Sequence, residues 1–353
     1  MNISSSESLA SFNVKVLLLF DKFRGTLSAR EAIEIVTSTA PEWAEIKGIG
    51  LSDGGEGLLE AIATERYTTS VHGPLGEKII AEFGSSIDGS AIIEMSKASG
   101  LTLVGGKDSN DPIAASTIGT GELIKVAIER GYRSVVVGCG GSATTDGGLG
   151  AFEVLRNLRG FERVDVTCLY DVETTFLDAA TDFAPQKGAT SKQVQFLRRR
   201  LMGTAQIYQG VYGISPVDVP GSGAAGGLAG FLHCAGASLV RGFDYVAEAL
   251  NLERHILECD VVVTGEGLLD EESFNGKVVG EVVKLARSAS KPIFILCGDS
   301  EITPGSRFLE GLASPVTLKE LVGIERSLNE PYSSLALAVD ELFNREISHY
   351  RQN

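Results

Sequence analysis

The stretch VKVLLLFDKFRGTLSAREAIEIVTST, residues 14–39, has the pattern of a strand that leads into a helix. Its first seven residues form an apolar run of strand length that only Lys15 interrupts. Ser28 and Glu31 have the spacing of a capping box, in which each side chain binds the backbone of the other residue at a helix start. A strand followed by a helix is the first half of a βαβ unit, and this favours an α/β fold with a parallel sheet.

The same order of elements returns elsewhere in the chain. Residues 46–65 read as a short strand, a glycine turn and a helix, and strands alternate with helices again from about residue 243. Between about 67 and 100, short β-rich runs separated by turns predict antiparallel strands. We therefore expect a parallel-sheet domain of residues 14–66 plus about 240–353, interrupted by an inserted α/β domain of about 67–239. Residues 1–13 are expected to be a flexible tail.

The composition of the chain limits which kinds of partner it binds and where in the cell it is located. The 353 residues include 31 Lys and Arg against 46 Asp and Glu, a net charge of −15 that argues against nucleic acid or an anionic membrane as partner. The N-terminus lacks the basic and apolar regions of a signal peptide, and no apolar run approaches about 18 residues. The five cysteines form no Cys-x-x-Cys pair, so we expect neither a zinc site nor disulfides, and a reducing cytoplasmic location.

Glycine is in excess, at 42 residues where average usage would give about 25. The clearest cluster is VVVGCGGSATTDGGLG, residues 135–150, where a buried strand enters a glycine turn that contains Ser142, Thr144 and Asp146. Glycine amides can approach and bind an anion. The alternative is that glycine only permits a tight turn and close packing of strand and helix. Both interpretations stay open from this segment alone.

Carboxylates and cations follow other strand-like runs in the same way. The carboxylates are Asp21, Asp53, Asp171, Glu266 and Asp270, and the cations near glycines are Arg24, Lys187 and Lys277. Ligands of open α/β sheets bind outside the carboxyl ends of the strands, where such turns gather. Phosphoryl transfer needs cations for phosphate charge, carboxylates for Mg²⁺ and a carboxylate base. A surface salt bridge is the alternative for each cation taken alone.

Other motifs are absent or weak. No Walker-type phosphate loop is present, and GSGAAG at 221–226 matches a dinucleotide fingerprint without a strong preceding strand, so small-residue packing is favoured there. The four histidines lack metal-ligand spacing, and the sequence assigns no metal ligand.

Eight segments between about residues 15 and 300 resemble, in order, the bacterial glycerate kinase family. They are LSDGGEG, GPLGE, IEMSKASGL, STIGTGELI, GGSATTDGG, PQKGAT, GSGAAGGLAGFL and VVTGEGLLDEESFNGK. The resemblance implies a two-domain kinase with a Rossmann-like domain, an inserted domain and an active site in the cleft between them. It also implies a small-molecule substrate, glycerate, which ATP phosphorylates with the help of Mg²⁺. The favoured product is 2-phosphoglycerate.

The resemblance also marks residues. Positions in family motifs are Asp53, Gly54, Gly55, Gly119, Thr120, Gly121, Ser142, Thr144, Asp146, Glu266, Asp270, Ser273 and Lys277. We expect the general base to be one carboxylate among Asp53, Asp146, Asp171 and Asp270. Lys277, Lys187 and Arg24 are expected to stabilise phosphate charge, and Asp21 belongs to the same substrate or phosphate site.

Several positions depart from the family pattern. The family's Asp-Ser-Phe-Lys-Gly-Ser motif is DKFRGT at residues 21–26, so Arg24 replaces a lysine, and Thr145 replaces an asparagine. Arginine is not equivalent to lysine at a phosphate. Residues 172–184 also differ from the family pattern. A divergent member that acts on another small hydroxy acid, or binds without glycerate kinase activity, therefore remains an alternative. The sequence leaves open whether the chain forms a homo-oligomer.

Overall fold

The computed structural model describes residues 13–23, 25–303 and 305–352, and the chain divides into two compact units. Unit 1 comprises the described parts of Met1–Leu51 and Asn251–Asn353, and unit 2 is Ser52–Leu250. Arg24 and residues 1–12 of the predicted tail lie outside the described residues. The sequence estimate placed residues 52–66 in the first domain, whereas here they pack in unit 2 because the short helix α2 (Leu58–Ile62) contacts strand β5 (Ala91–Glu94).

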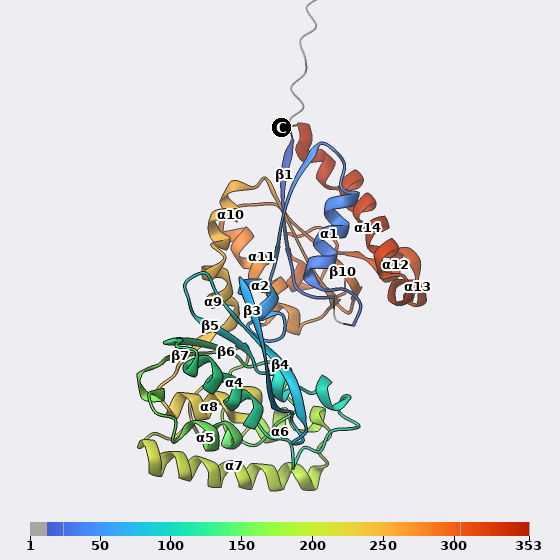
Figure 1. The fold of residues 1–353 in the computed structure, drawn as a ribbon. Helices are drawn as coiled ribbons and strands as arrows, with labels where there is room; N and C mark the ends of the chain where they lie inside the picture. The colour runs from blue at the N-terminus through green and yellow to red at the C-terminus, as the bar shows by residue number, and fades with distance from the viewer. Residues whose placement is uncertain (1–12, 24, 304, 353) are drawn as a thin grey trace, which may run out of the picture. The chain divides into compact units, whose positions relative to one another are not determined.

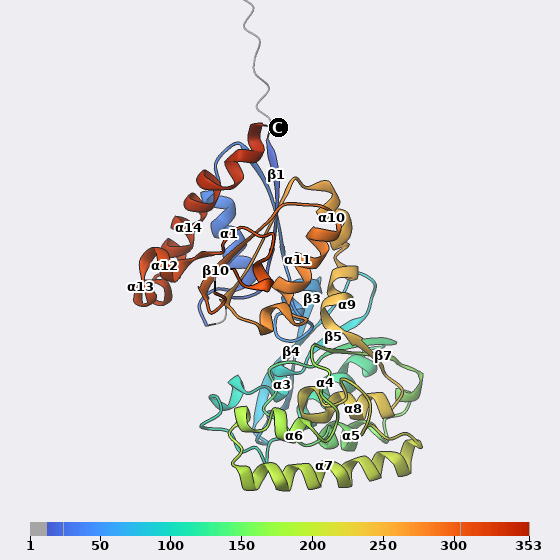
Figure 2. The same ribbon diagram turned by 180° about the vertical axis from the view of Figure 1, so that it is seen from behind.

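Unit 1 is built on a parallel sheet with the strand order β11-β10-β9-β1-β2. The strands are β1 (Val14–Phe20), β2 (Ala44–Gly50), β9 (Val261–Leu269), β10 (Ile293–Ser300) and β11 (Val316–Thr317). Helices α1 (Ala29–Thr39) and α14 (Pro331–Arg345) cover one face, and α10 (Leu252–Glu258) and α11 (Val278–Ser288) cover the other (Figures 1 and 2). The short helices α12 (Leu318–Val322) and α13 (Ile324–Asn329) precede α14.

Strand β1 lies between β2 and β9 and is apolar on both faces because helices cover both faces of the sheet. Leu18, Leu19 and Phe20 are fully buried. The predicted capping box is present, with the Glu31 amide donating to Ser28 Oγ and the Ser28 amide to the Glu31 carboxylate. The chain passes from β1 to β2 on one side and returns to β9 on the other, so the order of strands reverses between β1 and β9.

Unit 2 contains a six-stranded sheet with the order β3-β4-β5-β6-β7-β8. The remaining strands are β3 (Glu65–His72), β4 (Lys78–Ser85), β6 (Ser134–Gly138), β7 (Asp165–Tyr170) and β8 (Ser238–Arg241). Strands β3, β4 and β5 pair antiparallel, as residues 67–100 predicted, and β5 to β8 pair in parallel. Both units are therefore α/β structures, and the predicted fold class is confirmed.

Helices of unit 2 lie on both faces of its sheet and in an additional layer. On one side are α4 (Ile118–Glu129), α5 (Leu149–Leu155) and α8 (Ala224–Cys234), and on the other are α2 and α9 (Gly242–Ala249). Helix α7 (Ser191–Tyr212) packs against α8 and the short α6 (Ala179–Asp182) and forms the outermost layer (Figures 1 and 2). A one-turn α3 (Ser96–Ser99) follows β5.

Within the described residues, no helix combines the length and the apolar character needed to span a membrane. All five cysteines are buried and none forms a disulfide.

Candidate active site

Two glycine turns of unit 2 lie directly against each other. One, residues 52–57, precedes α2, and the other, residues 139–148, follows β6. A Cβ on Gly140 would come 2.6 Å from the Cα of Gly55, and a Cβ on Gly138 would come 2.4 Å from the Gly54 carbonyl oxygen. The backbones touch at these points, so a side chain at either position would force the turns apart. Close packing therefore explains these glycines, and it is one of the two interpretations that the sequence left open.

Asp146 holds the second turn in place. Its Oδ2 accepts hydrogen bonds from the Thr117 amide (2.9 Å), the Thr117 hydroxyl (2.8 Å) and the Gly150 amide (3.1 Å). Its Oδ1 accepts from the Gly148 amide at 3.0 Å, and the side chain is buried. A carboxylate that caps the start of both α4 and α5 in this way joins the two helices to the turn. These contacts favour a positioning role for Asp146.

Lys187 is buried beside the same turn. Its ammonium group donates to Ser142 Oγ and to the Thr144 carbonyl, both at 2.7 Å. Burial lowers the pKa of Lys187 to about 7, and the negative charge of Asp146 partly opposes that shift. Lys187 thus binds the turn from inside, and Ser142 receives one of its hydrogen bonds. The hydroxyl of Thr144 is also buried and contacts the Ala225 carbonyl at 3.5 Å.

Arg200 of α7 is a further member of this cluster that the sequence did not indicate. Its Nη1 donates to the Ile113 carbonyl at 2.6 Å and its Nη2 to the Thr145 carbonyl at 2.8 Å. Asn110 Nδ2 also donates to two carbonyls, those of Ala143 and Lys187. Such contacts join residues far apart in sequence, so no local pattern reveals them. The Thr145 hydroxyl is buried and has no hydrogen-bond partner within the described residues.

The remaining candidates of unit 2 differ in exposure. Asp53 is half-buried and accepts from the Gly55 amide at 3.0 Å. Asp171 is half-buried just beyond β7. The hydrogen bond with the Cys168 thiol, then burial, and least the negative charge of Asp171 raise the pKa of Cys139. Asp53 and Asp171 are thus the less enclosed of the unit 2 candidate carboxylates.

The Gly119-Thr120-Gly121 segment serves helix packing. A Cβ on Gly119 would lie 1.9 Å from the His72 carbonyl oxygen, and one on Gly121 would lie 2.7 Å from the Cα of Ala151 in α5. The Thr120 and Ser99 hydroxyls form a buried hydrogen bond of 2.8 Å. These residues hold α4 against its neighbours, and their contacts within the chain account for their small size.

The GSGAAG segment also packs against the second turn. Gly226 has a φ of +65°, and a Cβ there would lie 2.0 Å from the Thr144 carbonyl oxygen. The Gly147 amide donates to the Gly226 carbonyl at 2.9 Å. No strand leads directly into this segment, which lacks the strand-turn-helix context of a dinucleotide site.

In unit 1, the candidates lie at the carboxyl ends of β1 and β9, where the strand order reverses. The Asp21 amide donates to the Gly265 carbonyl at 3.3 Å, and Asp21 and Glu266 follow the paired residues Phe20 and Gly265 in register. Gly25 is exposed, has a φ of +83° and has open space where a Cβ would lie. Open α/β sheets bind ligands in the crevice at such a reversal point.

Asp270, Ser273 and Lys277 form the connection from β9 to α11. Asp270 Oδ1 accepts from the Ser273 amide (2.9 Å) and hydroxyl (3.2 Å), and the Ser273 hydroxyl accepts from the Asp270 amide. Lys277 immediately precedes α11 and pairs with Glu272 at 3.4 Å, with its side chain 32% exposed. Unlike Lys187, this lysine is accessible to a ligand.

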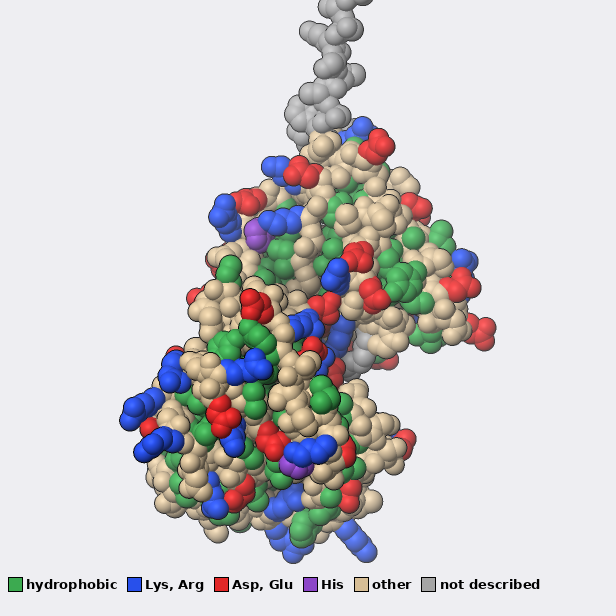
Figure 3. Space-filling model, in the orientation of Figure 1, with side chains coloured by type: hydrophobic (Ala, Val, Ile, Leu, Met, Phe, Trp, Pro, Cys, Tyr) green, Lys and Arg blue, Asp and Glu red, His purple; other side chains and the backbone are tan. Residues whose placement is uncertain are grey.

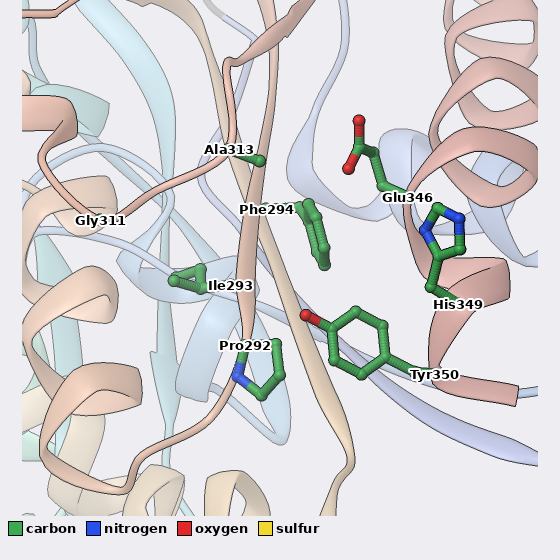
Figure 4. Close-up of a pocket in the computed structure, with 8 residues that line it drawn as sticks. All are labelled: Pro292, Ile293, Phe294, Gly311, Ala313, Glu346, His349 and Tyr350. Carbon is green, nitrogen blue, oxygen red and sulfur yellow. The ribbon is translucent and has the colours of Figure 1, made fainter. Parts of the chain in front are cut away.

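The described residues contain no group of three or more His, Cys, Asp and Glu side chains arranged to bind a metal ion. A shallow pocket of about 240 Å³ lies at the amino end of β10, between Phe294 and the C-terminal residues Glu346, His349 and Tyr350 (Figure 4). It is at the opposite end of the sheet from the candidate residues of unit 1 and shares none of them.

Comparison with known proteins shows extensive similarity. A model described as the Glycerate kinase family matches residues 16–159 and 155–345. Glycerate 2-kinase of Escherichia coli (strain K12) is 32% identical over 366 residues, which covers 92% of this chain and 96% of the relative. Glycerate kinase of Bacillus subtilis (strain 168) is 34% identical over 326 residues, or 81% of this chain and 85% of the relative. A crystal structure described as "putative glycerate kinase 2" from Salmonella typhimurium LT2 has a TM-score of 0.78 and 29% identity, and covers 97% of this chain and 100% of that chain.

Proposed function

Because the chain belongs to the glycerate kinase family, and is thus a kinase, we propose that it transfers the γ-phosphoryl group of ATP to glycerate. We favour 2-phosphoglycerate as the product, since the Escherichia coli relative is named for 2-kinase activity. The free, buried cysteines support a reducing cytoplasmic location as part of this proposal.

The observation that carries the proposal is the placement of charged residues where β1 ends beside β9 and where β9 leads into α11. Asp21 and Glu266 directly follow the paired residues Phe20 and Gly265 on the two neighbouring strands, and Lys277 immediately precedes α11, the helix that follows β9. A partly exposed lysine at the amino end of α11 suits a phosphate, because its charge and the helix dipole both attract anions. We infer that the phosphates of ATP bind at this edge of unit 1.

The carboxylates at this edge of unit 1 are sufficient to bind Mg²⁺ together with the phosphates of ATP. Mg²⁺ in kinase sites is held by one or two carboxylates together with phosphate oxygens, so a larger cluster of protein ligands is not required. Asp21, Glu266 and Asp270 are the carboxylates that would hold it. When bound, the ion would neutralise charge on the transferred phosphoryl group.

We propose that the base that accepts the proton of the glycerate hydroxyl is Asp53, Asp171 or Asp270. A base must keep an oxygen available to the attacking hydroxyl. Asp146 directs its two oxygens to four donors of the protein, so we assign it and Lys187 to holding the second glycine turn.

The test is release of ADP with D-glycerate, with the phosphorylated hydroxyl identified by NMR. Turnover that depends on both Mg²⁺ and glycerate, with phosphate on the 2-hydroxyl, is the expected result. The variants Asp53→Asn, Asp171→Asn and Asp270→Asn should include one that loses about 10²–10⁴ in kcat, the usual contribution of a general base. Folded protein without turnover on glycerate would refute the proposed reaction.

A divergent activity on another small hydroxy acid is the second candidate. The observation that favours it is Thr145, whose shorter side chain replaces the family's asparagine and leaves its buried hydroxyl without a hydrogen-bond partner within the described residues. Thermal stabilisation by ATP and Mg²⁺ but not by glycerate would support this candidate, and a panel of hydroxy acids would identify the substrate.

A further inference from the structure

Helix α7 is covered on one face only. On the covered face, its own residues Leu197, Leu201 and Tyr208 are buried. On the opposite face Phe196 and Ile207 are 47% and 43% exposed, and Val211 at the end of the helix is 57% exposed. Figure 3 shows green apolar and blue basic side chains together along this helix, at the lower edge of the view. This stripe of exposed apolar side chains along one face of the helix indicates a binding surface.

Two glycines lie in the middle of this stripe. Gly203 and Gly210 are seven residues apart and therefore share one face of the helix. A Cβ at either position would meet nothing within 4 Å. Each glycine destabilises a helix by about 1 kcal/mol relative to alanine, and no contact within the unit requires either one. Absent side chains at two points along one face allow the backbone of another helix to approach closely.

The charge of α7 is strongly polarised. Its basic residues are Lys192, Arg198, Arg199 and Arg200, all in the first half, and it has no acidic residue although the chain as a whole carries −15. Arg200 is turned inward to backbone carbonyls and Arg198 lies 4.0 Å from Asp178, so Lys192, Arg198 and Arg199 supply the charge of the exposed surface. The second half is uncharged and ends in backbone carbonyls with partial negative charge. Exposed Asp218 follows the helix end. A surface with a basic end and a negative end is complementary to a second copy of itself turned end to end.

We propose that the exposed face of α7 binds the same face of a second copy, antiparallel, about a two-fold axis that passes between Gln206 and Ile207. In this arrangement Gly203 of each copy opposes Gly210 of the other. Arg198 and Arg199 then lie beside the carboxyl end of the other helix and its Asp218. A parallel arrangement would instead place the two basic ends together, and like charges at that distance repel.

The size of this face predicts a weak dimer. A 22-residue helix is about 33 Å long, and a contact strip about 10 Å wide gives roughly 330 Å² per copy. Stable interfaces bury about 800 Å² per partner. The segment 213–218 continues the stripe through the exposed Ile214 and enlarges the contact, but the contact stays smaller than a stable interface. We therefore expect a dissociation constant in the micromolar range.

Sedimentation equilibrium of the full chain tests the surface. Between about 1 and 100 µM the protein should show a monomer–dimer equilibrium, and Ile207→Glu should weaken it at least about tenfold by burying a charge at the axis. Ile80→Glu is the matched control, because Ile80 is 71% exposed on β4 rather than on α7. A monomer at about 100 µM, or equal weakening by the control, would overturn the proposal.

Disulfide trapping tests the antiparallel orientation, and the buried native cysteines make it selective. Gln206→Cys lies next to the axis and should form a dimer when diamide oxidises its two thiols. Phe196→Cys lies ten residues further along the helix and should not, because the axis places the two Phe196 positions at opposite ends of the contact. Trapping through Phe196→Cys but not Gln206→Cys would refute this arrangement. The experiment does not depend on kinase activity, so its failure is distinguishable from failure of the proposed function.

Discussion

Asp146→Asn should destabilise unit 2 by about 3 kcal/mol. The asparagine oxygen can replace Oδ2 and keep the Thr117 and Gly150 contacts, but its amide group then faces the Gly148 amide, donor against donor. The lost bond leaves a buried donor unpaired, at about 1–3 kcal/mol, and the three retained bonds weaken by roughly 1 kcal/mol each when their acceptor is neutral. Removing a buried charge also removes its desolvation penalty, which offsets part of this sum.

Urea unfolding separates the effect on the two units. Trp43 is the only tryptophan and belongs to unit 1, so its fluorescence follows that unit, whereas far-ultraviolet circular dichroism follows both. The dichroism transition should move down by about 1–2 M urea in the Asp146→Asn variant, given usual denaturant slopes. Asp53→Asn is the matched control. Asp53 is half-buried and accepts one bond, so its loss should cost less than about 1 kcal/mol.

One result would refute the reasoning on Asp146. If Asp146→Asn abolishes activity while its free energy of unfolding stays within about 0.5 kcal/mol of wild type, the four hydrogen bonds contribute little. The carboxylate would then act on the ligand and not on the turn.

Three further predictions concern the same regions. The pKa of Lys187 is about 7 in the folded protein and about 10.4 in the unfolded chain, so the unfolded chain binds more protons between these two pH values. The burial of Lys187 therefore lowers the free energy of unfolding most below pH 7, and the free energy of unfolding rises as the pH increases above 7. The difference in unfolding free energy between wild type and Lys187→Met should therefore increase by about 2.3 kcal/mol from pH 7 to 9, because the folded lysine is already half deprotonated at pH 7, and a flat difference would contradict the shifted pKa. Gly140→Ala should lower the unfolding free energy by about 1–3 kcal/mol through overlap with the facing turn, whereas Gly203→Ala, on an open helix face, should not lower it. Lys277→Ala should reduce kcat about 100-fold with stability unchanged, and a loss of less than threefold would remove it from the phosphate site.

The sequence predicted the fold where local patterns decide structure. The apolar run at residues 14–20 is β1, Ser28 and Glu31 do form a capping box, and the short runs of residues 67–100 are antiparallel strands. The eight ordered motifs identified the family correctly. Each of these signals is contained within a few neighbouring residues or in their order along the chain.

Long-range contacts could not be predicted in the same way. The carboxylate of Glu94 caps α2 by accepting from the Gly57 and Leu59 amides, 37 and 35 residues away, and Arg200 reaches Thr145 across 55 residues. The longest helix, α7, was also missed, although Thr190 and Gln193 form a capping box and Gly213 ends it. Its many exposed apolar and basic residues obscure the usual helical pattern.

The contact between Gly55 and Gly140 bears on how variation in such proteins should be interpreted. Each residue occupies space that the other would need for a side chain, so a substitution at one cannot be compensated by a substitution at the other. In a saturation screen both positions should be intolerant even when cells are selected only for the amount of folded protein. Invariance at these glycines across an evolutionary tree would then record the crowding of two backbones, and would be no guide to which residues bind the substrate.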